Sequence, residues 1–221
     1  MAKERLDKLI ASTGRWSRRE VKTLVREGRV LVDGRIAGSA EEKYDAESCR
    51  IAVNGEELLL RRHTYVMLHK PAGVLSATED GRGRTVLDLL TPELRKIGVF
   101  PVGRLDKDTE GLLLLTDDGE LAHALLSPKK HVDKIYYARV SGRLAPEDCA
   151  AFEAGMTLGD GLECLPAGLE ILAAGETSEC LVTLREGKFH QVKRMLAARG
   201  KPVTYLKRLS MGALRLDDTL A

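Results

Sequence analysis

The first sixty residues alternate apolar and charged positions in a pattern that predicts two helices followed by a hairpin. Apolar residues recur at helical spacing at the start of the chain, at Leu6, Leu9 and Ile10. Gly14 ends this first helix, and Ser17 is a suitable N-cap for a second helix over residues 18–27, which Gly28 terminates. Residues 29–35 have the pattern of a strand, an Asp-Gly turn and a second strand. We therefore predict a compact module that ends near residue 58.

The second predicted helix has two distinct faces. Its apolar stripe consists of Val21, Leu24 and Val25. On an adjacent face, three cations follow one another at i, i+4 and i+8, namely Arg18, Lys22 and Arg26. Such a row is compatible with a surface that binds a polyanion and equally with an ordinary solvated helix face.

The pattern changes at residue 65, after a charged stretch at 61–64 that we interpret as a linker. Short apolar stretches, separated by Gly, Pro or Asp-Gly, predict strands at 65–68, 112–115, 135–140 and 180–184. Helical stretches lie around 118–126, 146–154 and 189–199. Because many connections are too short for regular parallel crossovers, we predict an α+β fold with a mostly antiparallel mixed sheet over 65–221, preceded by a small α/β module over 1–60.

The composition narrows the class of protein. The chain has 221 residues, of which 43% are hydrophobic and 31% charged, as in globular domains. The longest apolar run, at 112–115, is far shorter than the roughly 20 residues that span a bilayer, and the charged start Met1–Arg5 shows no signal peptide. The four cysteines have no zinc-ligand spacing, which favours free thiols: Cys49, Cys149, Cys164 and Cys180. We expect a cytoplasmic protein without membrane contact.

Charge is distributed unevenly along the chain. Residues 1–40 contain ten Lys or Arg and five Asp or Glu, whereas the whole chain has a formal net charge of only +2. A basic end on a near-neutral body suggests a polyanion-binding module attached to a second functional domain.

The segment 103–116 places charged and small residues in a loop that leads directly into an apolar strand. Anchoring a polar loop in this way can fix a catalytic carboxylate. Asp106, Asp108 and Glu110 also occupy positions 1, 3 and 5 of a calcium-loop pattern, but position 12 is Asp117 instead of Glu and four leucines follow. We therefore predict no metal site.

A second polar segment, residues 185–196, reads as a glycine turn followed by a helix. We predict that Phe189, Val192 and Leu196 form the apolar face of this helix. His190, Lys193 and Arg194 then lie near the helix start, where cations oppose the helix dipole unless an anion is nearby. Elsewhere, the alternation in 133–140 puts Tyr136 on one face of a strand, where a tyrosine is more often core than site.

Four motifs, in this order along the chain, resemble those of the RNA pseudouridine synthases. They are Lys70-Pro71-x-Gly73, then Gly103-Arg104-Leu105-Asp106 followed by Thr109 and Gly111, then Lys134-Ile135-Tyr136, and finally Gly187 to Met195. Residues 1–60 resemble the small RNA-binding module found in a small-subunit ribosomal protein and in bacterial tyrosyl-tRNA synthetases. The combination is similar to the RsuA branch, which modifies ribosomal RNA. The run Ser127–His131 followed by Lys134 and Tyr136 resembles the 16S-specific enzyme of that branch.

The resemblance implies a reaction and the residues that carry it. Asp106 would be the catalytic carboxylate, acting either as a nucleophile or as a base. Lys193 would be its basic partner, Tyr136 would stack on the target base, and Arg104 would strengthen the positive field or hold RNA. No cofactor and no metal is implied.

The implied substrate is a single uridine of 16S ribosomal RNA, within a partly assembled small subunit, and the enzyme would be a monomer. A 23S site and a non-catalytic RNA-binding assembly factor are the alternatives. We select the basic residues of the N-terminal module as RNA-binding: Arg5, Lys8, Arg18, Arg19, Lys22, Arg26 and Arg29.

Two features differ among members of the family. Lys193 stands where other branches have arginine, which supports the RsuA assignment. The chain stops at Asp218–Ala221, where relatives run on, so a short C-terminal element is expected to be missing.

Overall fold

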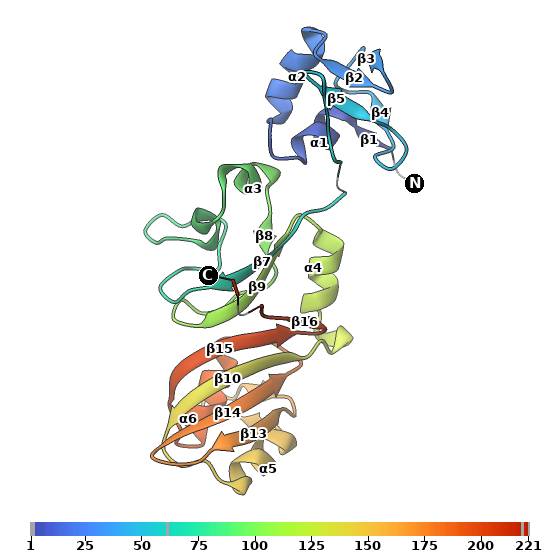
Figure 1. Ribbon diagram of the computed structural model, residues 1–221. Coiled ribbons are helices and arrows are strands. Elements are labelled where there is room, and N and C mark those ends of the chain that lie inside the picture. The colour runs from blue at the N-terminus through green and yellow to red at the C-terminus, as the bar shows by residue number, and fades with distance from the viewer. Residues whose placement is uncertain (1–2, 61, 218, 221) are drawn as a thin grey trace. The chain divides into compact units, whose positions relative to one another are not determined.

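The computed structural model describes residues 3–60, 62–217 and 219–220, and over these residues it divides into two compact units (Figure 1). The first comprises residues 1–65, 87–100 and 116–118, and the second comprises 66–86, 101–115 and 119–221. Part of the interpreted linker, Arg61, lies outside the described residues. So do Met1 and Ala2 of the charged start and Asp218 and Ala221 of the expected truncation.

The N-terminal part forms short strands and two helices around a small apolar core. Its elements are β1 (Glu4–Arg5), α1 (Leu6–Ala11), α2 (Arg18–Arg26), β2 (Val30–Val32), β3 (Arg35–Ile36), β4 (Lys43–Tyr44), β5 (Ile51–Val53) and β6 (Glu56–Glu57). The strands β3, β2, β5 and β6 pair in that order as an antiparallel sheet. The apolar faces of α1 and α2 pack with this sheet in one buried cluster that includes Leu6, Ile10, Val21, Val30 and Ile51.

Local sequence signals explain where α2 and the hairpin begin and end. The Ser17 side chain accepts a hydrogen bond from the Glu20 amide, and the Glu20 carboxylate accepts one from the Ser17 amide, which makes a capping box. Between β2 and β3, Asp33 and Gly34 both have positive φ angles, of 50° and 78°. These angles fit the tight turn that the Asp-Gly pair predicts.

After residue 64 the chain forms longer strands connected by helices. The elements are β7 (Tyr65–Lys70), η1 (Val86–Leu89), α3 (Pro92–Ile97), β8 (Phe100–Pro101), β9 (Glu110–Thr116), α4 (Gly119–Leu126), η2 (Pro128–Lys130), β10 (Lys134–Ser141), α5 (Pro146–Ala154), β11 (Met156–Thr157), β12 (Glu163–Cys164), β13 (Gly168–Ala173), β14 (Thr177–Leu184), α6 (Gln191–Ala198), β15 (Val203–Met211) and β16 (Leu214–Arg215).

A mixed, mainly antiparallel sheet organises this part of the chain. Its strand order is β13-β14-β10-β15-β9-β7, with β16 beside β15 and β8 beside β9. The pairs β13–β14, β14–β10 and β10–β15 are antiparallel, whereas β15 runs parallel to β9. The predicted α+β class, with a small N-terminal module before a mostly antiparallel sheet, is confirmed.

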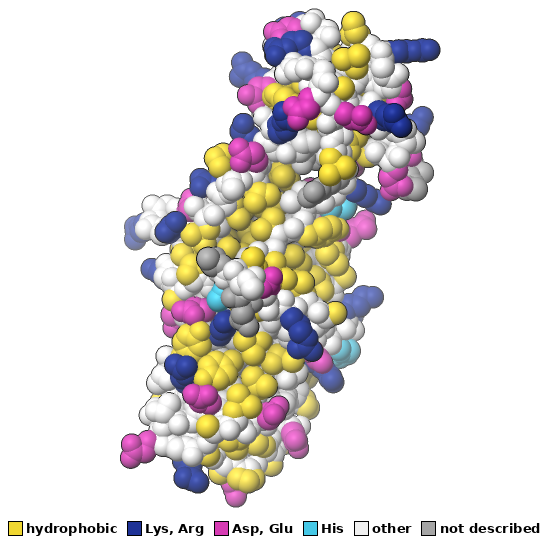
Figure 2. Space-filling model, in the orientation of Figure 1, with side chains coloured by type: hydrophobic (Ala, Val, Ile, Leu, Met, Phe, Trp, Pro, Cys, Tyr) yellow, Lys and Arg dark blue, Asp and Glu magenta, His cyan; other side chains and the backbone are white. Residues whose placement is uncertain are grey.

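The two faces of the sheet differ in their covering. Along β10, residues alternate between buried and more exposed positions, and Tyr136, Ala138 and Val140 are buried. The helices α5 and α6 lie behind the strands in Figure 1. On the viewer's side, Figure 2 shows hydrophobic side chains among charged ones over the same strands. Partly exposed Tyr137 and Tyr205 belong to these strands and meet edge to face, with ring centroids 6.0 Å apart.

The helix predicted over 189–199 begins later than the sequence indicates. It starts at Gln191, and His190 precedes it with a φ of 51°. The prediction that Phe189 lies on the apolar face of α6 is therefore wrong. Phe189 is 74% exposed, whereas Val192 and Leu196 are buried as expected.

Among the described residues, no helix is long and apolar enough to cross a membrane.

Candidate active site

The loop between β8 and β9 is anchored to its surroundings on both sides of Asp106. Just before it, the Leu105 amide donates to Ser76 Oγ at 3.0 Å, and the same hydroxyl donates to the Leu105 carbonyl at 2.9 Å. At the other end of the loop, Gly111 has a φ of 102°, and a Cβ there would lie 2.3 Å from the Arg208 carbonyl oxygen. Only glycine permits this close approach of β9 to β15. The loop is thus held in one place while its polar side chains remain free to act.

A buried lysine lies under the same loop. Lys70, at the end of β7, is fully buried, and its Nζ is within 2.8–3.3 Å of the carbonyl oxygens of Pro71, Asp106, Lys107 and Thr109. Burial lowers the pKa of Lys70 to about 8, although the carboxylates of Asp108, Asp106 and Glu110 oppose this shift. Lys70 therefore fixes the backbone of the loop through its carbonyl groups, immediately after Asp106.

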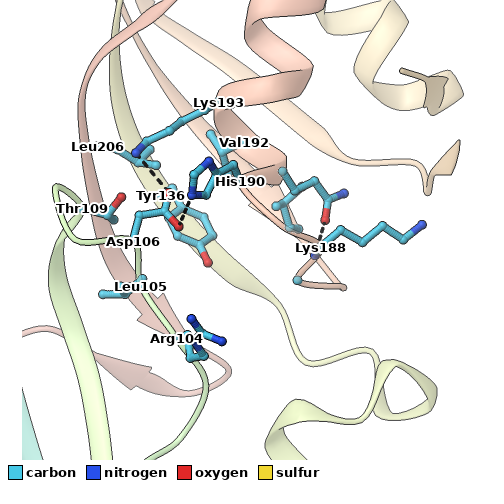
Figure 3. Close-up of a pocket in the computed structure, with 13 residues that line it drawn as sticks. Arg104, Leu105, Asp106, Thr109, Tyr136, Lys188, His190, Val192, Lys193 and Leu206 are labelled. Carbon is cyan, nitrogen blue, oxygen red and sulfur yellow. Dashed lines mark hydrogen bonds and ion pairs between the residues drawn. The ribbon is translucent and has the colours of Figure 1, made fainter. Parts of the chain in front are cut away.

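Asp106 faces two basic side chains from the start of α6 (Figure 3). Its Oδ2 lies 3.0 Å from Lys193 Nζ, and its Oδ1 lies 3.4 Å from His190 Nε2. The Asp106 side chain is 24% exposed, so the carboxylate stays accessible from solvent. This anion is the partner that the cations at the helix start require.

Lys193 is shared between two carboxylates. Its Nζ also lies 2.6 Å from Asp108 Oδ1. The hydrogen bond from Lys193 holds the pKa of Asp108 below its ordinary value. Burial disfavours the charge on Lys193, but the bonds to Asp108 and Asp106 outweigh it and raise the pKa of this ammonium group. Lys193 consequently stays positively charged beside Asp106 at neutral pH.

The turn before α6 is held by its own buried network. Glu186 is buried, and its Oε1 accepts hydrogen bonds from Gln191 Nε2 at 2.5 Å and from the Leu165 amide at 2.9 Å. Gln191 Oε1 accepts from the Lys188 amide at 3.1 Å. This network fixes the turn from which His190 and Lys193 reach Asp106.

A pocket opens beside the carboxylate. Its wall combines apolar, aromatic and charged side chains: Arg104, Leu105, Asp106, Thr109, Tyr136, Leu184, Gly187, Lys188, His190, Gln191, Val192, Lys193 and Leu206. Tyr136 lies on β10, opposite Val182 of β14 and Arg208 of β15, and is 9% exposed. The pocket offers a planar aromatic ring, an apolar floor and a paired carboxylate, which together suit a flat polar ring such as a nucleobase.

Comparison with known families identifies the protein class. The family described as RNA pseudouridylate synthase matches residues 64–198, and the family described as S4 domain matches residues 4–48. The chain belongs to the RNA pseudouridine synthases. Its N-terminal part is an S4 module, and its activity is the isomerisation of uridine in RNA.

Two of the relatives of this pseudouridine synthase are named for different ribosomal subunits, and a third is named without a target. The chain is 50% identical over 98% of its length to the "Uncharacterized RNA pseudouridine synthase YtzG" of Bacillus subtilis, of which 91% is covered. It is 39% identical, over 98% of its length and 92% of the relative, to "Ribosomal small subunit pseudouridine synthase A" of Vibrio cholerae. It is also 39% identical, over 96% of its length and 87% of the relative, to "Ribosomal large subunit pseudouridine synthase B" of Bacillus subtilis.

A solved structure shows the same architecture. A crystal structure titled "Crystal structure of pseudouridylate synthase" aligns with 99% of this chain and 93% of its own, with a TM-score of 0.67 and 34% identity. The alignment therefore includes both the S4 module and the pseudouridine synthase domain.

The structure brings the residues predicted for the pseudouridine synthase pocket together. Arg104, Asp106, Tyr136 and Lys193 come from three distant parts of the chain and line the same pocket. The three acids of the calcium-like pattern contact side chains of the second half of the chain. Asp106 and Asp108 pair with Lys193, and Glu110 Oε2 accepts from the Tyr205 hydroxyl at 2.7 Å.

Two contacts of Asp106 were not assigned from the sequence. Lys70 was noted only as part of a strand end and a family motif, and nothing in its spacing indicates that it supports a loop more than thirty residues away. His190 was expected near a helix start without a defined partner. The Lys-Pro-x-Gly motif and the cation-rich helix start were the signals available for these two residues.

In the S4 module, the seven predicted RNA-binding residues fall into two groups. Five of them form ion pairs: Arg5 and Arg18 with Asp7, Lys22 and Arg5 with Glu41, Lys8 with Glu4, and Arg29 with Glu27. Arg19 and Arg26 are exposed on α2, and no ion pair within the described part of the chain involves them. A shallow pocket lies among Arg5, Asp7, Arg18, Arg19 and Lys22.

Buried Asp7 organises this basic surface. Its carboxylate accepts from Arg5 Nε at 3.1 Å and from Arg18 Nη2 at 3.0 Å. Burial alone would raise the pKa of Asp7, but the bonds from Arg5 and Arg18 outweigh it and hold the pKa below its ordinary value. Asp7 thereby holds two guanidinium groups of the module in place, those of Arg5 and Arg18.

Proposed function

We propose that this pseudouridine synthase converts one uridine of 16S ribosomal RNA to pseudouridine and that Asp106 is its catalytic residue. The observation that carries the catalytic assignment is the ion pair of Asp106 with Lys193, on the wall of a pocket that Tyr136 also lines. The reaction breaks the bond between the ribose and N1 of uracil, turns the base, and joins the ribose to C5. The proton on C5 is then lost.

Each pocket residue has a proposed task in this reaction. Asp106 acts on the target nucleotide through its carboxylate, and Lys193 places a positive charge 3.0 Å from that group. Tyr136 stacks on the uracil ring, and Arg104 holds the RNA backbone near the pocket. The target uridine must leave its stack to enter, which costs a few kcal/mol that stacking and phosphate contacts have to offset.

The choice of the small subunit is supported by the run at 127–131 followed by Lys134 and Tyr136, which resembles the 16S-specific enzyme of the RsuA branch. Within this run Lys129 and Lys130 are exposed, and the run precedes β10, which contains Tyr136. One relative named for the small subunit and one named for the large subunit share the same identity with the chain. A uridine of 23S ribosomal RNA is therefore the second candidate.

The proposed partner is ribosomal RNA within a partly assembled small subunit. The S4 module supplies a basic surface that contacts phosphate groups, and shape is the main signal by which folded RNA is recognised. We propose that the protein acts as a monomer in the cytoplasm, where ribosomal RNA is assembled.

The assignment of Asp106 and of the substrate can be tested together. Pseudouridines are mapped in ribosomal RNA from cells with the gene, without it, and complemented with the wild-type or the Asp106→Asn form. We expect one 16S pseudouridine to be lost without the gene and to be restored by the wild type alone. Purified Asp106→Asn should bind 16S RNA with the affinity of the wild type, because the substitution keeps the shape of the side chain.

Each result is informative about a different part of the proposal. Turnover by Asp106→Asn would contradict the catalytic assignment. Loss of a 23S pseudouridine instead of a 16S one would contradict the substrate while leaving the assignment of Asp106 intact.

A further inference from the structure

An exposed aromatic stack extends outward from the candidate active site. The rings of Phe189 and His190 are nearly parallel, with an interplanar angle of 18° and centroids 3.8 Å apart. Phe189 is 74% exposed, although the sequence around it has the pattern of a buried helix face. Phe189 thus presents a large apolar ring to solvent while one of its faces contacts His190.

The backbone holds this stack outside the core. His190 has a φ of 51°, in the left-handed region that a non-glycine residue rarely adopts, and it immediately precedes α6. From Gln191 onward the helix is buried through Gln191, Val192, Met195 and Leu196. The unusual conformation of His190 thus separates the two exposed rings from the buried helix. Backbone strain of this kind persists where the surrounding structure fixes it, and it is concentrated at functional sites.

The stack begins at the reacting group. His190 lines the pocket and lies 3.4 Å from Asp106 through its Nε2, so Phe189 is separated from the carboxylate by a single imidazole ring. Phe189 itself is not part of the pocket wall. A nucleotide bound against Phe189 would therefore be a neighbour of the one bound at Asp106, and not the same nucleotide.

We propose that Phe189, supported by His190, is the stacking platform for the nucleobase next to the target uridine. This inference rests on the proposed function, in which the target uridine enters the pocket at Asp106. When that uridine leaves its stack, the adjacent base loses a stacking partner on one side. The exposed face of Phe189 replaces it. Stacking on an aromatic ring is tolerant of base identity, so Phe189 stabilises the opened RNA without reading its sequence.

The first test compares variants that separate ring stacking from apolar bulk. Phe189→Leu keeps an apolar side chain without an aromatic face, whereas Phe189→Tyr keeps the face. The probe is full-length 16S or 23S RNA transcribed with uridine tritiated at C5, because pseudouridine formation releases that hydrogen. We expect Phe189→Leu to lower kcat/KM by roughly tenfold, mainly through KM, and Phe189→Tyr to stay within about twofold of the wild type.

A control variant accounts for general surface effects. Leu172, on β13, is also an exposed apolar residue and is not part of the pocket wall. Leu172→Ala should leave kcat/KM unchanged. Because Phe189 is exposed, we expect the thermal unfolding midpoint of Phe189→Leu to match that of the wild type, so that a loss of activity reports binding.

The second test locates the base that stacks. Short RNAs carrying the mapped target uridine are prepared with an abasic nucleotide on its 5′ side or on its 3′ side. At one of these positions the abasic RNA should abolish the difference between the wild type and Phe189→Leu, because the stacking partner is gone.

Distinct results overturn the inference and the proposed function. Equal kcat/KM for the wild type and Phe189→Leu would overturn the inference, as would equal losses for Phe189→Leu and Phe189→Tyr. A difference that persists with both abasic RNAs would overturn it as well. If the wild type releases no tritium from either ribosomal RNA, the proposed function fails, whatever the Phe189 variants do.

Discussion

Asp106 owes its surroundings to residues that are far from it in sequence. Lys193 and His190 approach its side chain, while Lys70 binds the backbone carbonyl of the same residue. The two kinds of contact have different consequences. Lys193 places a positive charge beside the carboxylate, and the contacts with Lys70 determine where the loop carries it. Separate lysines therefore contact the side chain and the backbone of Asp106.

The lowered pKa of Lys70 predicts that the stability of the protein depends on pH. Its pKa in the folded protein is about 8, below the ordinary 10.5, because burial disfavours its charge. Between pH 8 and 10.5 the unfolded chain holds a proton that the folded protein has released, so the free energy of unfolding rises with pH. We expect this increase to reach up to about 3 kcal/mol in the wild type. In Lys70→Met it should be missing.

Urea denaturation of the wild type and of Lys70→Met, each at pH 7 and at pH 10, measures this effect as a difference in the free energy of unfolding. Other lysines and tyrosines that titrate in the same range cancel in the comparison. The free energy of unfolding of the wild type, minus that of Lys70→Met, should increase as the pH increases. A constant difference would mean that Lys70 has an ordinary pKa in the folded protein.

The residues that line the pocket could be predicted from the order of the motifs. The contacts that involve backbone groups and backbone conformation could not. Arg104, Asp106, Tyr136 and Lys193 could be selected from their motifs, and they do line one pocket. Lys70 is part of the Lys-Pro-x-Gly motif, but its role depends on carbonyl groups, which every residue has, so the motif does not indicate which loop Lys70 binds. Phe189 was misplaced because helical periodicity continues through it, whereas the left-handed His190 delays the helix.

Among the elements, those with strong local signals were predicted and those that depend on distant pairing were not. The capping box gives the start of α2, and the run of leucines gives β9. The sequence does not predict the long strand β15, because polar residues interrupt its apolar pattern at Thr204, Lys207 and Arg208. It is stabilised instead by β10 and β9, the latter about a hundred residues earlier in the chain.

The helix α2 predicts how the S4 module binds RNA. Arg19 and Arg26 are exposed without ion pairs in the described structure, so each can neutralise a phosphate group at no cost of a broken pair. Replacing both with alanine should reduce the slope of log affinity against log salt by about 1.4 to 1.8. Filter binding to 16S RNA over a series of KCl concentrations measures this slope.

Two control variants sharpen that measurement. Arg143→Ala removes an exposed cation outside the module and should leave the slope unchanged. Arg18→Ala should lower the free energy of unfolding in addition to the affinity, because it removes one of the two guanidinium partners of buried Asp7. If Arg19→Ala with Arg26→Ala leaves the slope at the wild-type value, the α2 cations are a solvated face.

We expect substrate choice to depend on both the pocket and the S4 module. In the proposed reaction the pocket acts on one flipped uridine, whereas the basic residues of the S4 module would contact phosphate groups, which carry no sequence information. An RNA that engages the two units at once gains affinity over one that engages either alone, because the second contact becomes intramolecular. The spacing of two sites in folded RNA is therefore a selective feature.

For the proposed 16S substrate, binding at two sites predicts which form of the small subunit is modified. We expect the distance between the target uridine and the segment that binds the S4 module to vary in naked 16S RNA. We expect ribosomal proteins of a partly assembled particle to fix that distance while the uridine is still accessible. We expect tritium release from such particles to exceed release from naked 16S RNA by at least about tenfold in kcat/KM. Mature small subunits should react slowly, because the uridine is covered.

Replacing Arg19 and Arg26 should reduce the rate more on particles than on naked RNA, since only on particles does the S4 contact assist the pocket. Equal rates on particles and naked RNA would show that the pocket selects its uridine without the S4 module.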